Sequence, residues 1–201
     1  MHVLKFSLSC ALSVLAAGAV AADEATTATL SESKVSLAEV TKQGSAGKSF
    51  TAGTLIAAPV SQLCALLQDY EAYPSFMPNT TSTTLTQKGA GYSVIDVTLG
   101  LPMGKVKKYR LRMEPKVSGQ SCRLAWKLVP WPGLKPDETI VDTTGHWELT
   151  PASSAGKTAV RYHVYTDAGP IPFGLGWIVD SLSRDSIPHT LEALRKRAAS
   201  R

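Results

Sequence analysis

Apolar and polar residues alternate along much of the second half of the chain, which is typical of β-strands with one buried and one solvated face. Ile95, Val97 and Leu99, for example, alternate with Asp96 and Thr98. Patterns of this kind predict strands over Thr81–Thr86, Tyr92–Leu99, Lys105–Glu114, Cys122–Val129, Thr139–Thr150 and Thr158–Asp167. The connections are short and rich in glycine, proline and serine, whereas a parallel crossover needs a dozen or more residues. We therefore expect an antiparallel meander.

After residue 174 the apolar residues recur at the spacing of a helix rather than at that of a strand. The apolar positions are Leu175, Ile178, Leu182, Leu191, Leu194 and Ala198. Pro188 lies inside this pattern and cannot donate a hydrogen bond to the Arg184 carbonyl, so we expect a kink or a break there. A single helix with one apolar face needs a sheet to lie on. The sequence thus predicts an α+β fold, a curved antiparallel sheet with a long C-terminal helix across its concave side.

Two strands and two short helices precede the meander. Val35–Val40 and Ser49–Ala57 have strand patterns, and Pro59 begins a helix. Tyr70–Pro78 is a short aromatic-rich helical piece, and we interpret Asp69 as a cap between the two helices.

The N-terminus has the pattern of a secretory signal peptide. A basic residue, Lys5, precedes the apolar run Phe6–Ala17 and the small residues Ala19-Val20-Ala21. A lipoprotein signal using Cys10 is disfavoured, because few apolar residues precede that cysteine. We expect a signal peptide over residues 1–21, a flexible leader over 22–34 and one domain over 35–199. Cleavage near Ala21 would give a periplasmic or secreted protein, which we expect to be a monomer.

Charge and cysteine content narrow the function further. The formal net charge is +5, and basic residues gather at residues 105–110 and 195–197. Solvated strand and helix faces explain these runs best, and transient contact with an anionic membrane surface is the alternative. Nucleic acid is a poor partner for an exported protein. Cys64 and Cys122 remain after processing, and the sequence leaves open whether they form a disulfide or are buried separately.

The order of these segments resembles the START-like (SRPBCC) superfamily, which has the helix-grip fold. The nearest groups are the coenzyme Q-binding proteins and the polyketide cyclase-like proteins. The matching segments are Ala58-Pro59-Val60, Leu67–Tyr70 with Tyr73-Pro74, Gly145–Leu149, Gly156–Val160, Ile171-Pro172 with Trp177–Val179, and Ile187–Arg195. Similar proteins bind lipids, sterols, quinones or other apolar molecules between the sheet and the helix, and some are enzymes. The resemblance therefore implies the fold but not the ligand.

A long helix cannot easily fill the concavity of a curved sheet, so we expect a ligand cavity beneath it. The candidate lining residues are Val97, Leu111, Met113, Leu124, Trp126, Trp147 and Tyr162 from the sheet, and Trp177, Ile178 and Leu182 from the helix. Gly100–Gly104 and Gly169–Gly176 are the candidate entrance loops. We expect an exported carrier or chaperone for a lipid, a sterol-like molecule or a quinone, with no cofactor or metal.

An enzyme of the same fold is the alternative, and the sequence does not decide whether catalysis occurs. A cyclase or dehydratase would use Asp69 or Asp96 as a buried acid. A metal-assisted hydrolase would use His189 and Glu192, three residues apart, with His146 and His163 on neighbouring strands. The alternation, however, places both strand histidines and Asp96 on the solvated face, and His189 lies in a basic, solvent-like pattern. We therefore favour binding over catalysis.

Overall fold

The computed structural model describes residues 30–169 and 176–200, without the side chains of Met103 and residues 176–183. The predicted signal peptide and the first part of the leader lie outside this range, as do Ile171 and Pro172. The last leader residues contact the domain, because the Ser31 carbonyl accepts hydrogen bonds from the Leu55 amide and the Thr54 hydroxyl. No helix within the described ranges is both long and apolar enough to cross a membrane.

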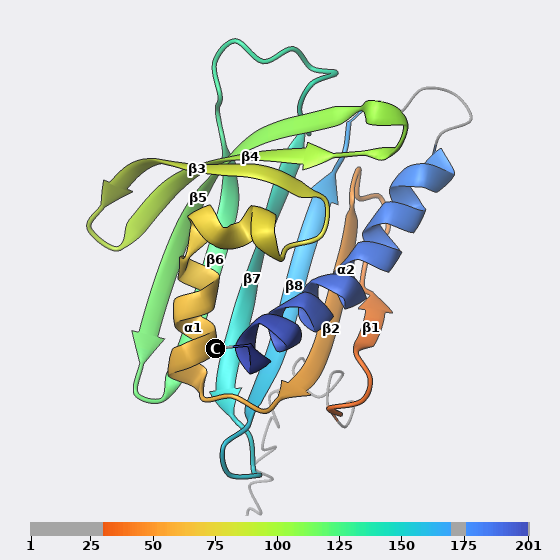
Figure 1. The fold of residues 1–201 in the computed structure, drawn as a ribbon. Coiled ribbons are helices and arrows are strands. Elements are labelled where there is room, and N and C mark those ends of the chain that lie inside the picture. The colour runs from red at the N-terminus through yellow and green to blue at the C-terminus, as the bar shows by residue number, and fades with distance from the viewer. Residues whose placement is uncertain (1–29, 170–175, 201) are drawn as a thin grey trace, which may run out of the picture.

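The described residues form one eight-stranded antiparallel sheet in the order β1-β2-β8-β7-β6-β5-β4-β3. The strands are β1 (Ser36–Glu39), β2 (Lys48–Ile56), β3 (Thr80–Gly89), β4 (Tyr92–Gly100), β5 (Val106–Ser118), β6 (Ser121–Val129), β7 (Asp142–Pro151) and β8 (Thr158–Asp167). The helical elements are α1 (Val60–Gln68), the 3₁₀ turns η2 (Tyr70–Ser75) and η3 (Pro102–Gly104), and α2 (Gly176–Ala199). The sheet curves around α2, with α1 and η2 on the same side (Figure 1). This is the curved antiparallel sheet with a long C-terminal helix that the apolar pattern predicted, and it is the helix-grip arrangement that the resemblance implied.

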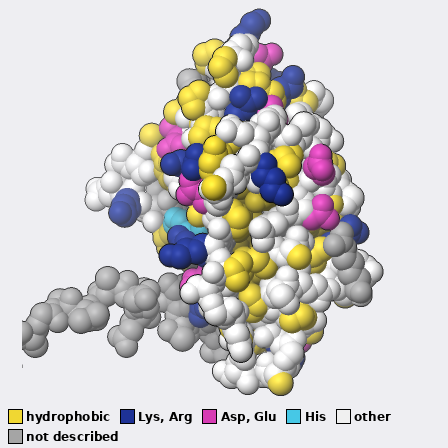
Figure 2. Space-filling view, turned by 90° about the vertical axis from the view of Figure 1, so that its left-hand side faces the viewer, with side chains coloured by type: hydrophobic (Ala, Val, Ile, Leu, Met, Phe, Trp, Pro, Cys, Tyr) yellow, Lys and Arg dark blue, Asp and Glu magenta, His cyan; other side chains and the backbone are white. Residues whose placement is uncertain are grey.

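The two faces of the sheet differ in chemistry. On the concave face the side chains of Ile95, Leu111 and Met113 are buried. On the convex face, Asp96 accepts two hydrogen bonds from Arg110, of 2.6 and 2.9 Å, across the β4–β5 pair. Acidic and basic side chains are interspersed on the side of the molecule seen in Figure 2. The convex face of β4 and β5 therefore has a charged pair where the concave face of the same strands is apolar.

The helix α1 covers one end of the concave face. Its Leu63, Leu66 and Leu67 are at most 1% exposed, and α1 packs against β6 and β7. Cys64 of α1 and Cys122 of β6 form a disulfide, with Cα atoms 6.1 Å apart. This covalent link fixes α1, and with it the start of η2, over the sheet.

The C-terminal half of α2 is anchored by apolar and polar contacts. Leu191 and Leu194 are fully buried. Arg195 donates hydrogen bonds to Glu192, to the Thr54 hydroxyl and to the Leu55 carbonyl. The basic run at 195–197 is thus not simply a solvated face. The helix α2 continues through Pro188, so of the kink or break that the sequence predicted, the break does not occur.

Candidate functional site

A cavity of about 340 Å³ lies in the middle of the concave face, between the sheet, η2 and α2. It exists because α1 fills one end of the concavity, while only Ser186, Ile187 and Thr190 of the described α2 side chains line it. The remaining described lining is Tyr73, Met77, Pro78, Asn79, Thr80, Ile95, Val97, Leu99, Leu101, Lys107, Tyr109, Leu111, Met113, Trp126, Ile140, Thr143, Trp147, Tyr162, Val164, Thr166 and Ala168. The wall is mostly apolar with a few polar groups, which is the usual composition of a small-molecule site.

Three aromatic rings from adjacent strands make the floor of the cavity. The Tyr162 ring lies between two indoles, stacked on Trp126 at 5.5 Å and tilted against Trp147 at 4.5 Å between ring centres. Gly145 of β7 makes room for this arrangement. A Cβ atom there would lie 2.3 Å from the Trp126 ring and 2.3 Å from the His163 carbonyl oxygen. The absence of a side chain at position 145 therefore lets Trp126 lie flat on the sheet.

Three tyrosines, Tyr73, Tyr109 and Tyr162, bring hydroxyl groups to the cavity lining. The Tyr73 hydroxyl donates to the Leu67 carbonyl at 2.5 Å. Burial raises the pKa of Tyr73, Tyr109 and Tyr162 well above the ordinary value of a phenol. Within the described part of the chain, the Tyr109 and Tyr162 hydroxyls have no hydrogen-bond partner. At neutral pH these phenols are protonated, and the last two are free to donate to a ligand.

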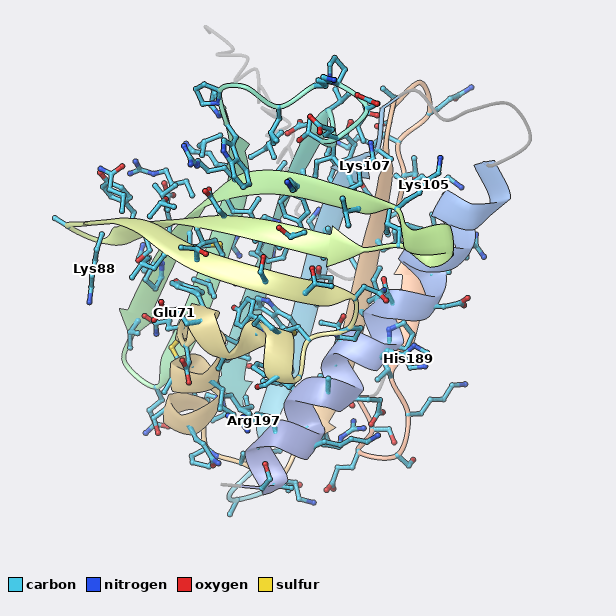
Figure 3. The ribbon with its side chains drawn as sticks, turned by 45° about the horizontal axis from the view of Figure 1, so that its top comes forward. Glu71, Lys88, Lys105, Lys107, His189 and Arg197 are labelled. Carbon is cyan, nitrogen blue, oxygen red and sulfur yellow. A yellow bond between two sulfur atoms is a disulfide. The ribbon has the colours of Figure 1, made fainter. Side chains whose placement is uncertain are left out.

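Lys107 is the charged residue of the described lining. Its ammonium group donates to the Thr139 carbonyl at 2.6 Å. Burial lowers the pKa of Lys107 and nearby Lys105 lowers it further, whereas Asp137 acts in the opposite direction. Lys105 and Lys107 lie at the end of the molecule near the first turns of α2, far from Lys88 on the β3–β4 hairpin (Figure 3). Leu101, in the candidate entrance loop Gly100–Gly104, also lines the cavity, so we take this end to be its mouth.

Six of the ten predicted binding residues line the cavity, namely Val97, Leu111, Met113, Trp126, Trp147 and Tyr162. Leu124 does not line it. It points to the concave side, but it is fully buried in the core that α1 covers. The side chains of Trp177, Ile178 and Leu182 lie outside the described residues.

The sequence prediction missed several polar lining residues, including Lys107, Tyr109 and Thr143. Lys107 and Tyr109 alternate along β5 with the same spacing as Leu111 and Met113, so all four side chains point to the same face of the sheet. This alternation was the sequence signal that could have identified them as lining residues. The Thr143 hydroxyl donates to the Tyr165 carbonyl at 2.7 Å. No sequence signal distinguished this threonine from the other threonines of the strands.

The residues proposed for catalysis or metal binding lie elsewhere. His146 and His163 do not line the cavity, and their rings are 5.5 Å apart on the neighbouring strands β7 and β8. His189 is exposed on α2 (Figure 3), and Glu192 pairs with Arg195. Asp69 lies between α1 and η2 without a side-chain capping hydrogen bond. Among the described residues, no group of three or more His, Cys, Asp or Glu side chains could hold a metal ion.

The histidine pair predicts that the protein loses stability in mild acid. Burial, Arg123 and His163 lower the pKa of His146 from 6.5 to about 4, and burial and Arg123 lower that of His163. Between pH 6.5 and about 4, the unfolded chain therefore binds protons that the folded protein excludes. The free energy of unfolding should fall as the pH drops through this window. Above pH 6.5 the pair should contribute no pH dependence.

Urea unfolding at several pH values between 4 and 7.5 measures this effect. We expect His146→Gln to reduce the pH slope, while His189→Gln at the exposed helix position should leave it unchanged. Equal slopes for the wild type and His146→Gln would show that the pair does not cause the acid sensitivity.

Comparisons with known proteins agree with this architecture. A model of the family described as polyketide cyclase / dehydrase and lipid transport matches residues 56–195. No curated protein matches the sequence significantly.

Several solved structures share the fold. A STAR-related lipid transfer protein from Xanthomonas axonopodis is 19% identical with a TM-score of 0.71, and the match covers 82% of this chain and 93% of that one. The Zhui aromatase/cyclase from Streptomyces sp. R1128 is 14% identical with a TM-score of 0.61, over 83% and 94% of the two chains. Human StAR-related lipid transfer protein 5 is 14% identical with a TM-score of 0.69, over 83% and 82%. At these identities the likeness concerns the fold alone.

Proposed function

The chain belongs to the polyketide cyclase / dehydrase and lipid transport family. We propose that it is an exported carrier, which shields a hydrophobic small molecule from water in the central cavity. The observation that carries the proposal is the cavity itself, about 340 Å³ of space with an aromatic floor and mostly apolar walls. Burial of apolar ligand surface contributes roughly 25 cal/mol per Å², so a long acyl chain or a ring system would bind without any covalent step. Lipids, sterol-like molecules and quinones all have such surfaces.

The ionisable groups of the described lining favour binding over acid–base catalysis. They are Lys107 and the three tyrosines Tyr73, Tyr109 and Tyr162. Burial raises the pKa of each of these tyrosines, so they are hydrogen-bond donors at neutral pH and poor bases. The Asp96 carboxylate, which a cyclase or dehydratase would need in the cavity, is engaged by Arg110 on the opposite face.

Two further features support an exported protein that meets membranes. The Cys64–Cys122 disulfide suits an oxidising compartment. Val106 and Val141 are 46% and 57% exposed, and each is adjacent in sequence to a lining residue, Lys107 or Ile140. Exposed apolar side chains beside a cavity suit a transient membrane contact during loading. The carrier acts as a monomer in this proposal.

Ligand capture tests the proposal directly. Protein stripped of lipid is exposed to a membrane lipid and quinone extract, and native mass spectrometry reads the bound mass. We expect one hydrophobic molecule per chain. Protein that remains empty after this exposure would contradict the proposal.

A cavity-filling variant locates the bound molecule. Val97 lines the cavity and is 4% exposed, so Val97→Phe should reduce ligand capture at least about tenfold by occupying ligand space. Val94 is on the same strand and does not line the cavity, so Val94→Phe is the matched control and should bind normally. Equal capture by both variants would place the ligand outside this cavity.

A further inference from the structure

We propose that the preferred ligand is a single-chain amphiphile with one anionic head group, a carboxylate or a phosphate monoester, that binds the Lys107 ammonium group at the mouth of the cavity. This inference rests on the proposed function and specifies the ligand class. Three observations carry it: the order of side chains along β5, the hydrogen bonding of Lys107, and the size of the cavity.

The inward positions of β5 run from charged to apolar. Lys107, Tyr109, Leu111 and Met113 are alternate residues, and all four line the cavity. An antiparallel strand rises about 3.4 Å per residue, so the Cα atoms of Lys107 and Met113 are about 20 Å apart along the strand. Trp126 is opposite Met113 in the β5–β6 register and continues the apolar end. A head group at Lys107 would therefore direct its tail towards the aromatic floor.

Lys107 has capacity for an anion. An ammonium group has three N–H donors, and one of them is used by the Thr139 carbonyl. Asp137 is near enough to influence the ammonium group, but among the described residues no carboxylate lies within the 4.0 Å ion-pair distance of it. The described lining contains no aspartate or glutamate either. The partly desolvated positive charge is thus without a close counter-ion, and an anionic head group would supply one.

The cavity volume favours one chain over two. At about 340 Å³ it lies near the lower end of the range of roughly 300–1,000 Å³ that small-molecule sites occupy. A second acyl chain would roughly double the apolar volume that the cavity has to hold.

Three probes with the same tail test the head-group preference: hexadecanoate, hexadecyl phosphate and hexadecanol, each at a concentration at which it is dissolved as single molecules. Binding to the full mature chain is followed by the fluorescence change of the tryptophans, two of which, Trp126 and Trp147, line the cavity. We expect at least one acid to bind about tenfold or more tightly than the alcohol, as a charge-assisted hydrogen bond would give. The two acids distinguish a fatty-acid head group from a phosphate.

Lys107→Met should bring the affinities for the acids down to that for the alcohol, whereas Lys107→Arg should keep the acids ahead of the alcohol. Lys108→Met is the matched control, because it removes the same charge from the adjacent residue, which does not line the cavity. The proposal is wrong if the wild type binds the alcohol as tightly as both acids, or if Lys107→Met keeps the acid preference. It is also wrong if none of the three probes binds while the extract supplies another ligand, and in that case the proposed carrier function stands. If neither the probes nor the extract give a bound molecule, both fail.

Discussion

Reduction of the Cys64–Cys122 disulfide should lower the free energy of unfolding by about 4 kcal/mol. The two cysteines are 58 residues apart, and opening a loop of this length returns much conformational entropy to the unfolded chain. The link also holds α1 over β6, where Leu63 and Leu124 are fully buried. Urea unfolding with and without dithiothreitol measures the change.

A double Cys64→Ala, Cys122→Ala variant is the control for this experiment. It should resemble the reduced wild type and should not respond to dithiothreitol. Because α1 leads directly into η2, whose Tyr73 lines the cavity, the variant should also bind hydrophobic ligands less tightly. An unfolding midpoint that is the same in the oxidised and reduced wild type would contradict the stabilising role of the disulfide.

The fold could be predicted because burial of one sheet face imposes a strict period of two on the sequence. The last strand, expected over Thr158–Asp167, has these bounds in β8. The strand expected over Lys105–Glu114 continues to Ser118, where the exposed side chains of the β5–β6 hairpin no longer alternate with buried ones. Pattern alone thus located the strands better than their ends.

The cavity was harder to predict than the fold, because inward direction does not distinguish a cavity wall from a packed core. Leu124 and Trp126 are both inward residues of β6, yet α1 covers the first and the second faces open space. The difference between these two residues depends on where α1 packs on the sheet. The packing of α1 is tertiary structure, which the alternation along a strand does not show.

Lys107 was missed for a different reason. It stands in a basic run with Lys105, Lys108 and Arg110, and the run favours a solvated face. The alternation of β5 distinguishes these neighbours. Lys107 points to the same face of the sheet as Tyr109, while Lys108 and Arg110 point to the other face. A charged residue at an inward position of an otherwise apolar strand face is the signal that could have located the cavity mouth.

Gly145→Ala should be strongly destabilising, although alanine adds a single methyl group. The new Cβ atom would lie 2.3 Å from the His163 carbonyl oxygen on β8 and 2.3 Å from the Trp126 ring. The backbone oxygen cannot move without a shift of the β7–β8 pair, and the indole can move only by leaving the floor of the cavity. Overpacking of this kind costs about 3 kcal/mol, against the small gain that Gly→Ala gives by restricting the unfolded chain. Chemical unfolding and ligand capture should both be affected.

Gly100→Ala is the matched control for this substitution, because it makes the same chemical change in another strand of the sheet. There the new Cβ atom would meet the Thr81 methyl group at 3.0 Å, and Thr81 is an exposed side chain that can turn away. We therefore expect a change in the free energy of unfolding within about 1 kcal/mol. If Gly145→Ala were as mild as Gly100→Ala, Trp126 would not depend on the bare backbone at position 145. The aromatic floor would then have to be held by the contacts of Trp126 and Trp147 with Tyr162 alone.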